Sequence, residues 1–374
     1  MLDRTIRIEG PVRRIAVFRA LFLGDLICAL PAFRALAEGF PEAEITLIGL
    51  PWASEFIGRI PYIHRFETFS GFEGIMEVPY VPDRTRAFVA RARKRRYDIA
   101  LQMHGSGAIS NGFAAGLGSR LVAGYRNGPD ERLDVSLQYH WGEHEVLRWL
   151  RLVEALGVPA GIAPVDFAVT AVERREAARL LSFAPDLPGP VIGLHTGAKD
   201  PARRWPAKHF ARLADLLIQH YGARIVLTGS EGERETTEAV RGMMRCPALD
   251  LAGKTSLGTF VALIARLGLL VTNDTGASHV AALTRTRSVS LFGPSRPEEW
   301  APLDRKQHRV IDALKHGEPN TDPVTALAQL PVEPVVEACD EQLCPVLEEG
   351  STNVAGKNGA PCGRQRYVEA SWSG

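Results

Sequence analysis

Short apolar runs bounded by glycine, asparagine or aspartate alternate along the chain with longer segments of helical periodicity. Runs that are apolar throughout are typical of strands buried on both faces of a parallel sheet. We expect strands at residues 14–19, 44–50, 97–103, 119–126, 165–169, 190–195, 223–227, 249–253, 269–272 and 288–292. We expect helices at residues 26–36, 145–156, 173–181, 208–221, 233–244, 256–266 and from 278 onward. This alternation predicts right-handed βαβ units and therefore the α/β fold class.

The stretch from residue 269 to residue 283 is the most informative of these units. An apolar strand leads into Asn273, Asp274 and Gly276, and an alanine-rich helix follows from Ser278. The first N–H groups of such a helix have no partners inside it and carry partial positive charge, so they favour a phosphate. Asn273 and Asp274 are the candidate caps of this helix, and capping alone explains Asp274 equally well.

A second glycine turn, at residues 293–295, follows the next predicted strand. Both turns then lie at the carboxyl ends of neighbouring parallel strands, where open α/β sheets bind ligands.

The length of 374 residues predicts two domains, which we place at residues 1–170 and 171–330. Residues 331–374 form an extension that we expect to be partly disordered or packed back on the first domain. A hydrophobic content of 45% and a charged content of 23% are ordinary for a soluble protein, and a net charge of +1 gives no reason to expect a nucleic-acid partner. The five cysteines do not form a disulfide or zinc spacing.

The beginning of the chain does not resemble a secretory signal, and no apolar segment approaches the roughly 20 residues of a membrane span. We therefore expect a cytoplasmic protein. Residues 84–96 are strongly basic. They are either a solvated helix face or a patch that meets an anionic partner or a lipid surface.

Three motifs occur together in the order of a known family. The motifs are Leu-Gly-Asp at 23–25 with Leu-Pro-Ala at 30–32, then Thr-Gly-Ala at 196–198 with Arg-Arg-Trp-Pro at 203–206, then Asn-Asp-Thr-Gly at 273–276 with His279 and Phe-Gly-Pro at 292–294. From about residue 14 to about residue 303, the chain resembles glycosyltransferase family nine, the lipopolysaccharide heptosyltransferases.

The resemblance implies a glycosyltransferase B fold, in which two Rossmann-like domains face each other across a cleft. It implies a nucleotide-sugar donor, usually ADP-heptose, on the second domain and a precursor of the lipopolysaccharide inner core on the first. It also implies inversion at the anomeric carbon, no metal and no cofactor, and possible peripheral contact with the cytoplasmic face of the inner membrane. Alternatives are a family relative with another nucleotide sugar or acceptor and a non-catalytic nucleotide-sugar binder, which would have no need of Asp25.

Asp25 is, by this resemblance, the general base that takes the acceptor proton, and its alternative is to cap the following helix. Without a metal, the leaving ADP must be met by cations and backbone N–H groups. The residues expected to bind the donor are Thr196, Gly197, Lys199, Arg203, Glu231, Asp274, Thr275, Gly276, Ala277 and His279.

Several roles within this donor set stay open. Glu231 is expected at the ribose hydroxyls, with Glu233 as its rival, and Asp274 is expected to accept hydrogen bonds from the donor sugar. Thr275 is expected to bind phosphate through its hydroxyl. His279 either reaches phosphate or packs. Family members often have lysine where this chain has Arg203, so the division of the phosphate contact between Lys199 and Arg203 is undecided.

On the acceptor side, an anionic core precursor calls for cations in the first domain. The candidate acceptor residues are Gly24, Arg59, Arg65, Arg120 and Arg126. Each arginine taken singly is also consistent with a solvated surface position.

Overall fold

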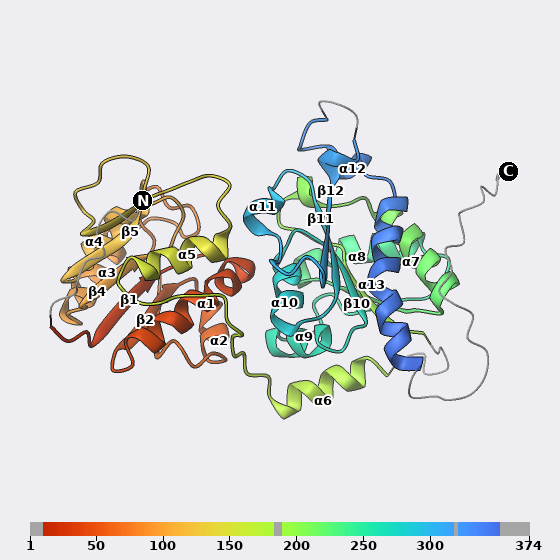
Figure 1. Cartoon of the computed structure of the whole chain (residues 1–374), viewed down its shortest axis with the longest axis horizontal. Coiled ribbons are helices and arrows are strands. Elements are labelled where there is room, and N and C mark those ends of the chain that lie inside the picture. Colours follow the sequence, from red (N-terminus) through yellow and green to blue (C-terminus); the bar gives the residue numbers. More distant parts are fainter. Residues whose placement is uncertain (1–9, 183–188, 318–320, 352–374) are drawn as a thin grey trace.

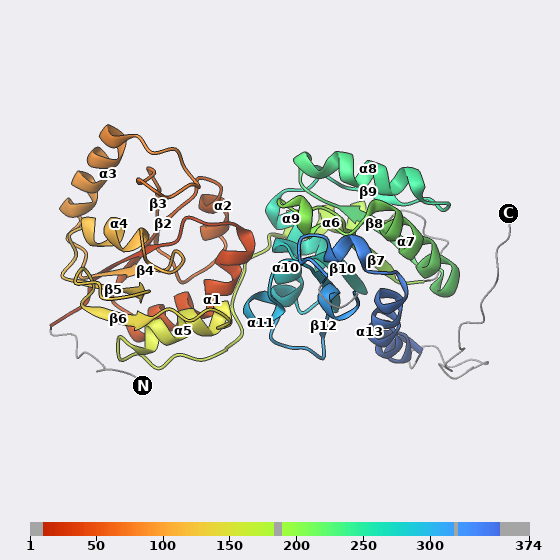
Figure 2. The same cartoon turned by 90° about the horizontal axis from the view of Figure 1, so that it is seen from above.

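The computed structural model describes residues 10–182, 189–317 and 321–351. It has two lobes, each built on a parallel six-stranded sheet with helices on both faces (Figures 1 and 2). The strand orders are β3-β2-β1-β4-β5-β6 and β12-β11-β10-β7-β8-β9. When the strands of each lobe are numbered from one, both orders read 3-2-1-4-5-6, which is the Rossmann order.

Within residues 10–170, which the structure describes, the first domain contains six strands and five helices. Its strands are β1 (Arg14–Phe18), β2 (Glu44–Gly49), β3 (Arg65–Thr68), β4 (Ile99–Gln102), β5 (Leu121–Arg126) and β6 (Val135–Gln138). Its helices are α1 (Leu23–Gly39), α2 (Ala53–Ile57), α3 (Pro82–Lys94), α4 (Ser110–Gly116) and α5 (Glu145–Glu154). Successive residues of β1 belong to different cores: Ile15 and Val17 pack on the side of α1 and α5, and Phe18 packs on the side of α3 and α4.

The second domain follows a connecting segment and helix α6 (Ala171–Leu180). Its strands are β7 (Val191–His195), β8 (Arg224–Thr228), β9 (Leu249–Asp250), β10 (Leu269–Asn273), β11 (Ser288–Phe292) and β12 (His308–Asp312). Its helices are α7 (Ala207–Tyr221), α8 (Arg234–Met243), α9 (Leu257–Ile264), α10 (Gly276–Thr284), α11 (Pro297–Trp300), α12 (Ala326–Gln329) and α13 (Glu333–Ser351), with short 3-10 turns at Pro201–Arg203, Glu231–Glu233 and Ala313–Lys315.

The predicted α/β class and the two Rossmann-like domains are confirmed, and most predicted elements lie within a few residues of their expected positions. The strand predicted at residues 165–169 is wrong. That segment is apolar because it packs between the domains, and it has no neighbouring strand with which to pair; the N–H of Ala168 instead donates to the carbonyl of Arg59 at 2.7 Å. The sheet-edge strands β3, β6 and β12 were not predicted.

The extension after residue 331 begins with helix α13, which contacts β10, β11, β12 and α7. Its residues Val335, Val336 and Cys339 are buried in the core of the second domain. This part of the extension therefore completes the second domain and does not pack back on the first (Figure 1). The rest of the predicted tail, residues 352–374, lies outside the described residues.

The two domains meet along α1 and α10, which contact each other directly. Side chains of both helices belong to one hydrophobic cluster, so the core of the first domain continues into the second. This contact places the start of α1 beside the start of α10, and each of these helices follows the strand at which its sheet reverses order.

Candidate active site

A cavity of about 940 Å³ lies between the domains at the carboxyl ends of β1, β7, β8 and β10. Open α/β sheets bind ligands at this edge, next to the point where the strand order reverses. The wall contains nine of the residues predicted from the sequence: Gly24, Asp25, Lys199, Arg203, Asp274, Thr275, Gly276, Ala277 and His279.

Two glycines let the starts of α1 and α10 approach across the domain boundary. A Cβ atom on Gly24 would lie 2.6 Å from Cδ2 of His279, and one on Gly276 would lie 3.2 Å from Cβ of Leu23. A side chain at position 24 would therefore require the His279 ring or the helices to shift. Gly24 thus serves the packing of the two domains as well as lining the cavity.

Asp25 is the third residue of α1, because this helix begins at Leu23 and not at residue 26 as predicted. The N-cap of α1 is Phe22, so the expected capping role of Asp25 is wrong; instead Oδ2 of Asp25, at the third helical position, accepts the N–H of Phe22 at 3.1 Å, as in a capping box. Its side chain is 19% exposed, and the residue also lines the cavity. Burial raises the pKa of Asp25, Arg19 opposes this and Glu145 adds to it, and the net shift is upward. A carboxylate with a raised pKa is a stronger base than an ordinary aspartate.

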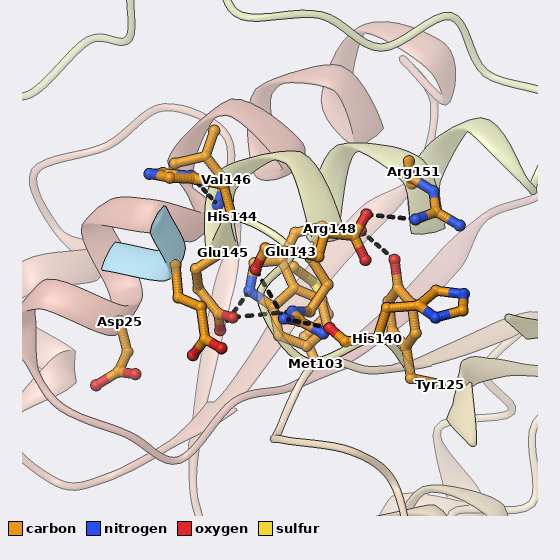
Figure 3. A network of polar contacts seen from close by, with 12 residues as sticks. Asp25, Met103, Tyr125, His140, Glu143, His144, Glu145, Val146, Arg148 and Arg151 are labelled. Carbon is orange, nitrogen blue, oxygen red and sulfur yellow. Dashed lines mark hydrogen bonds and ion pairs between the residues drawn. The ribbon is translucent and has the colours of Figure 1, made fainter. Parts of the chain in front are cut away.

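Arg19, which is fully buried, contacts Asp25 and does not line the cavity. Asp25 and Glu145, which both interact with Arg19, are labelled in Figure 3. Its Nε donates to the backbone oxygen of Asp25 at 2.9 Å, and its Nη2 lies 3.7 Å from Oδ1 of the same residue. Its Nη1 donates to the carbonyl of Met103 at 2.6 Å. The guanidinium also stacks over the Trp149 ring, 4.7 Å from its centre.

Glu145, at the start of α5, neutralises Arg19. Its Oε1 accepts hydrogen bonds from Arg19 Nη2 at 3.0 Å and from Trp149 Nε1 at 2.9 Å, while its Oε2 accepts from Arg148 Nε at 3.1 Å. Every charge in this buried group therefore has a partner. The sequence analysis missed Arg19 and Glu145. A single arginine at the end of an apolar strand was the available signal for Arg19, but nothing local pointed to Glu145.

The start of α10 differs from the start of α1 in its cap and in its charge. Its cap is Thr275, whose Oγ1 accepts the N–H of Ala277 at 3.3 Å, so the predicted caps Asn273 and Asp274 are wrong. The first turn of α10 contains no acidic residue. This helix start therefore presents partial positive charge to the cavity without a carboxylate of its own.

Asp274 and Arg203 are partners of each other. Arg203 Nη1 lies 3.1 Å from Asp274 Oδ2, and the hydroxyl of Ser295 donates to the same oxygen at 2.5 Å. Asp274 is only 4% exposed. Because its carboxylate pairs with Arg203, it reduces the net positive charge that Arg203 presents to the cavity.

Lys199, unlike Arg203, has no carboxylate partner in the part of the chain that the structure describes. Its Nζ lies 3.9 Å from the centre of the Phe22 ring, across the domain boundary. Among residues 10–182, 189–317 and 321–351, no carboxylate lies within ion-pair distance of Lys199. The geometry therefore favours Lys199 over Arg203 as the main contact for an anion.

Thr196 and Gly197 lie behind the cavity wall and do not line it. The side chain of Asn273 donates to their backbone oxygens, at 2.9 Å and 3.2 Å, and accepts the N–H of Trp205 at 3.1 Å. A Cβ atom on Gly197 would lie 2.2 Å from Oε1 of Glu233. This motif therefore shapes the wall and makes room for Glu233.

Glu233, and not Glu231, lines the cavity. Its Oε2 accepts the backbone N–H of Ser230 at 2.7 Å and the hydroxyl of the same residue at 2.8 Å. Glu231 is exposed and pairs with Arg234 at 2.7 Å. The placement favours the rival residue for any contact with ribose hydroxyls.

His279 packs between the domains. It is buried, and its Nδ1 lies 3.4 Å from Sγ of Cys28. Burial lowers the pKa of His279 to about 4, so the ring is neutral near pH 7 and offers no positive charge to a phosphate. His195 and Phe260, which the sequence analysis did not select, also line the cavity, with ring centres 5.9 Å apart.

None of the four predicted acceptor arginines lines this cavity. Arg59 pairs with Glu173 at 2.7 Å and with Glu55 at 2.9 Å, next to the connecting segment. The other three have partners elsewhere in the first domain: Arg65 with Glu67, Arg120 with Asp98, and Arg126 with Ser136. The cavity therefore gives no support to an acceptor contact through these four arginines, and their role stays a prediction.

Comparison with protein families gives a match to glycosyltransferase family 9 (heptosyltransferase) over residues 85–324. Lipopolysaccharide heptosyltransferase 2 of Salmonella typhimurium is 30% identical over 321 residues, which cover 80% of this chain and 87% of that protein.

Solved structures show the same architecture. The ADP-heptose lipopolysaccharide heptosyltransferase II of Escherichia coli is 25% identical with a TM-score of 0.69, covering 90% of this chain and 99% of that one. A family 9 glycosyltransferase from Veillonella parvula is 20% identical with a TM-score of 0.73, covering 90% and 98%. The predicted glycosyltransferase B fold is confirmed.

Proposed function

The chain belongs to glycosyltransferase family 9 and is a glycosyltransferase, and from this premise we propose that it transfers a heptose from ADP-heptose to a precursor of the lipopolysaccharide inner core. ADP-heptose and lipopolysaccharide are the donor and the acceptor for which its relatives from Escherichia coli and Salmonella typhimurium are named. The proposal includes Asp25 as the general base, inversion at the anomeric carbon and independence of metal ions.

One observation carries the proposal. Asp25 and the acid-free start of α10 line the same cavity, one from each domain, with Lys199 beside them. A carboxylate and an anion-binding helix start on opposite domains are what a displacement with a diphosphate leaving group needs.

In the proposed reaction, the acceptor hydroxyl oxygen forms a bond to the anomeric carbon of the heptose while the bond from that carbon to the diphosphate oxygen breaks. The electron pair of the broken bond leaves with ADP, and the hydroxyl proton passes to Asp25. Lys199 and the N–H groups at the start of α10 stabilise the charge that develops on the diphosphate. Glu233 accepts hydrogen bonds from the ribose hydroxyls.

Titration calorimetry with ADP, UDP and GDP tests the donor class, and we expect ADP to bind at least about tenfold more tightly than the other two. A transfer assay with ADP-heptose and a core precursor then tests the reaction. We expect full turnover in EDTA. Equal affinity for the three nucleotides would contradict the ADP-sugar donor, and loss of turnover in EDTA with rescue by magnesium would contradict metal independence.

A further inference from the structure

Phe22 occupies a position that usually belongs to another kind of residue. It is the N-cap of α1, where serine, threonine, aspartate or asparagine is preferred, and its side chain makes no capping hydrogen bond. The carboxylate of Asp25 accepts the N–H of Phe22 instead. The Phe22 ring is 41% exposed and lines the cavity. A large apolar side chain that is neither a cap nor buried breaks the local rules, as residues of functional sites do.

The Phe22 ring contacts Lys199, which belongs to the other domain. Lys199 Nζ lies 3.9 Å from the ring centre, well within the roughly 6 Å over which the face of an aromatic ring attracts a cation. Both residues line the cavity. Their contact therefore crosses the domain boundary at the place where the donor is proposed to bind.

The carboxylates of the cavity wall leave Lys199 to this ring. Four carboxylates of the described chain line the cavity, and each accepts a hydrogen bond from a group other than Lys199. Lysine has a long flexible side chain, and ordering it costs conformational entropy. The four pairs are Asp25 with the N–H of Phe22, Asp200 with the N–H of Ala202, Glu233 with Ser230, and Asp274 with Arg203.

An aromatic ring can hold a cation without neutralising it. Asp274 reduces the net positive charge that Arg203 presents to the cavity, but the Phe22 ring has no net charge. The ring contacts one side of the Lys199 ammonium group, which carries three N–H donors. Donors that do not face the ring remain for a phosphate.

We propose that Phe22 is a positioning residue for the donor diphosphate, because its ring holds the Lys199 ammonium group at the cavity wall before the nucleotide binds. The diphosphate then meets a cation that is already ordered, so less conformational entropy is lost on binding. The first domain thereby contributes to donor affinity, although the cation belongs to the second. This inference rests on the proposed function, because it takes the anion at Lys199 to be the donor diphosphate.

Calorimetry with ADP on the full chain measures the contribution of the ring. Phe22→Leu should weaken ADP binding by about twofold to tenfold, the cost of immobilising one flexible side chain. Phe22→Tyr keeps an aromatic face and should bind ADP like the unmodified protein. The matched control is Phe40→Leu, at the half-buried C-cap of the same helix, which should leave the ADP dissociation constant unchanged. Circular dichroism and thermal melting check that each variant folds.

Two further measurements separate the cation–π contact from simple packing. Fluorinated phenylalanines incorporated at position 22 keep the ring but weaken the negative charge of its face, so ADP affinity should fall as fluorine atoms are added. In a double-mutant cycle, Phe22→Leu should have no further effect on ADP binding once Lys199→Ala is present, because the ring acts only through the ammonium group.

The transfer assay gives a third readout. Phe22→Leu should raise the KM for the nucleotide sugar and leave kcat nearly unchanged, because the backbone N–H of residue 22 still binds the Asp25 carboxylate. A loss confined to kcat would contradict a role in holding the diphosphate.

Equal weakening by Phe22→Leu with and without Lys199→Ala would overturn the proposal in favour of a purely structural role. Tighter ADP binding in Phe22→Leu would also overturn it, since the ring would then compete with the phosphate for the ammonium group. Equal affinity for ADP, UDP and GDP would contradict only the donor class of the proposed function. The Phe22 variants can still be compared in that case, because all three nucleotides carry the same diphosphate.

A ligand-free measurement completes the test. The ring current of Phe22 should shift the NMR signals of the Lys199 side chain in the protein without nucleotide, and Phe22→Leu should abolish this shift. If the Lys199 signals are the same in both proteins, the ring does not hold the ammonium group and the proposal fails, whatever nucleotide the protein binds.

Discussion

The junction of β1 with α1 and the junction of β10 with α10 have the same local geometry and opposite electrostatics. Each is a strand at the point where its sheet reverses order, followed by a turn and the start of a helix that faces the cavity. In α1 the third helical residue is Asp25, and in α10 the third helical residue is Ser278.

One side chain therefore decides what each junction can bind. In α1, the carboxylate accepts the N–H of Phe22 and puts a negative charge in the first turn, which repels a second anion there, while it remains available as a base. In α10, the partial charge of the helix start is left to an external anion. The charged surroundings differ as well: Arg19 and Glu145 form a buried ion pair next to Asp25, whereas Lys199, from the second domain, lines the cavity without a carboxylate partner in the described chain and contacts the Phe22 ring at the start of α1.

Removing the carboxylate of α1 should have the largest effect. Asp25→Ala should lower kcat by at least about a hundredfold, within the range of general-base catalysis, while ADP affinity stays within about threefold. Steady-state kinetics and ADP calorimetry measure the two quantities, and Asp25→Asn serves as the isosteric control that should lose as much turnover. Full activity in either variant would remove Asp25 from the mechanism.

Removing Lys199, the cavity cation without a carboxylate partner among the described residues, should come next. Lys199→Ala should weaken ADP binding by about tenfold to a hundredfold, the usual loss for a hydrogen bond to a charged group. Lys208, exposed on α7 of the same domain, supplies the control Lys208→Ala, which should leave the ADP dissociation constant unchanged. If Lys199→Ala leaves the ADP dissociation constant unchanged, Lys199 does not make the main phosphate contact, and Arg203 becomes the candidate for it.

Copying the chemistry of α1 into α10 is the most direct test of the comparison. Ser278 is fully buried at the third helical position and does not line the cavity, so Ser278→Asp would act through its charge, which offsets the helix dipole and repels the diphosphate. We expect ADP affinity to fall by about tenfold, from the loss of the helix-dipole contribution and added repulsion. Ser278→Asn, of the same size without the charge, should bind nearly normally; equal loss in both variants would mean that packing, not charge, is at work.

Changing the network behind Asp25 should give the smallest effect at neutral pH. Glu145 contributes to the raised pKa of Asp25, so Glu145→Gln should lower that pKa. Because the base must be ionised, activity rises with pH through this pKa, and the acid limb of the kcat/KM profile should move to lower pH.

Glu154, which lies on α5 like Glu145 but is exposed, supplies the control: Glu154→Gln should leave the acid limb of the kcat/KM profile at the pH of the unmodified protein. A lower plateau in Glu145→Gln without movement of the limb would indicate a purely structural role for Glu145.

What the sequence determined by itself was local. Apolar runs, turn residues and helical periodicity predicted the buried strands and both helix starts at the cavity, because each signal lies within a few neighbouring residues. The sheet-edge strands β3, β6 and β12 were missed, since β3 and β12 are largely exposed or half-buried and their patterns are weak.

Tertiary structure decided which side chains are partners. Arg19 meets Glu145 across 126 positions in the chain, and Arg203 meets Asp274 across 71. Glu233 faces the cavity while Glu231, two residues earlier, faces solvent. Pairing and burial of charges depend on what the fold brings into contact, and the local pattern of a sequence does not contain that information.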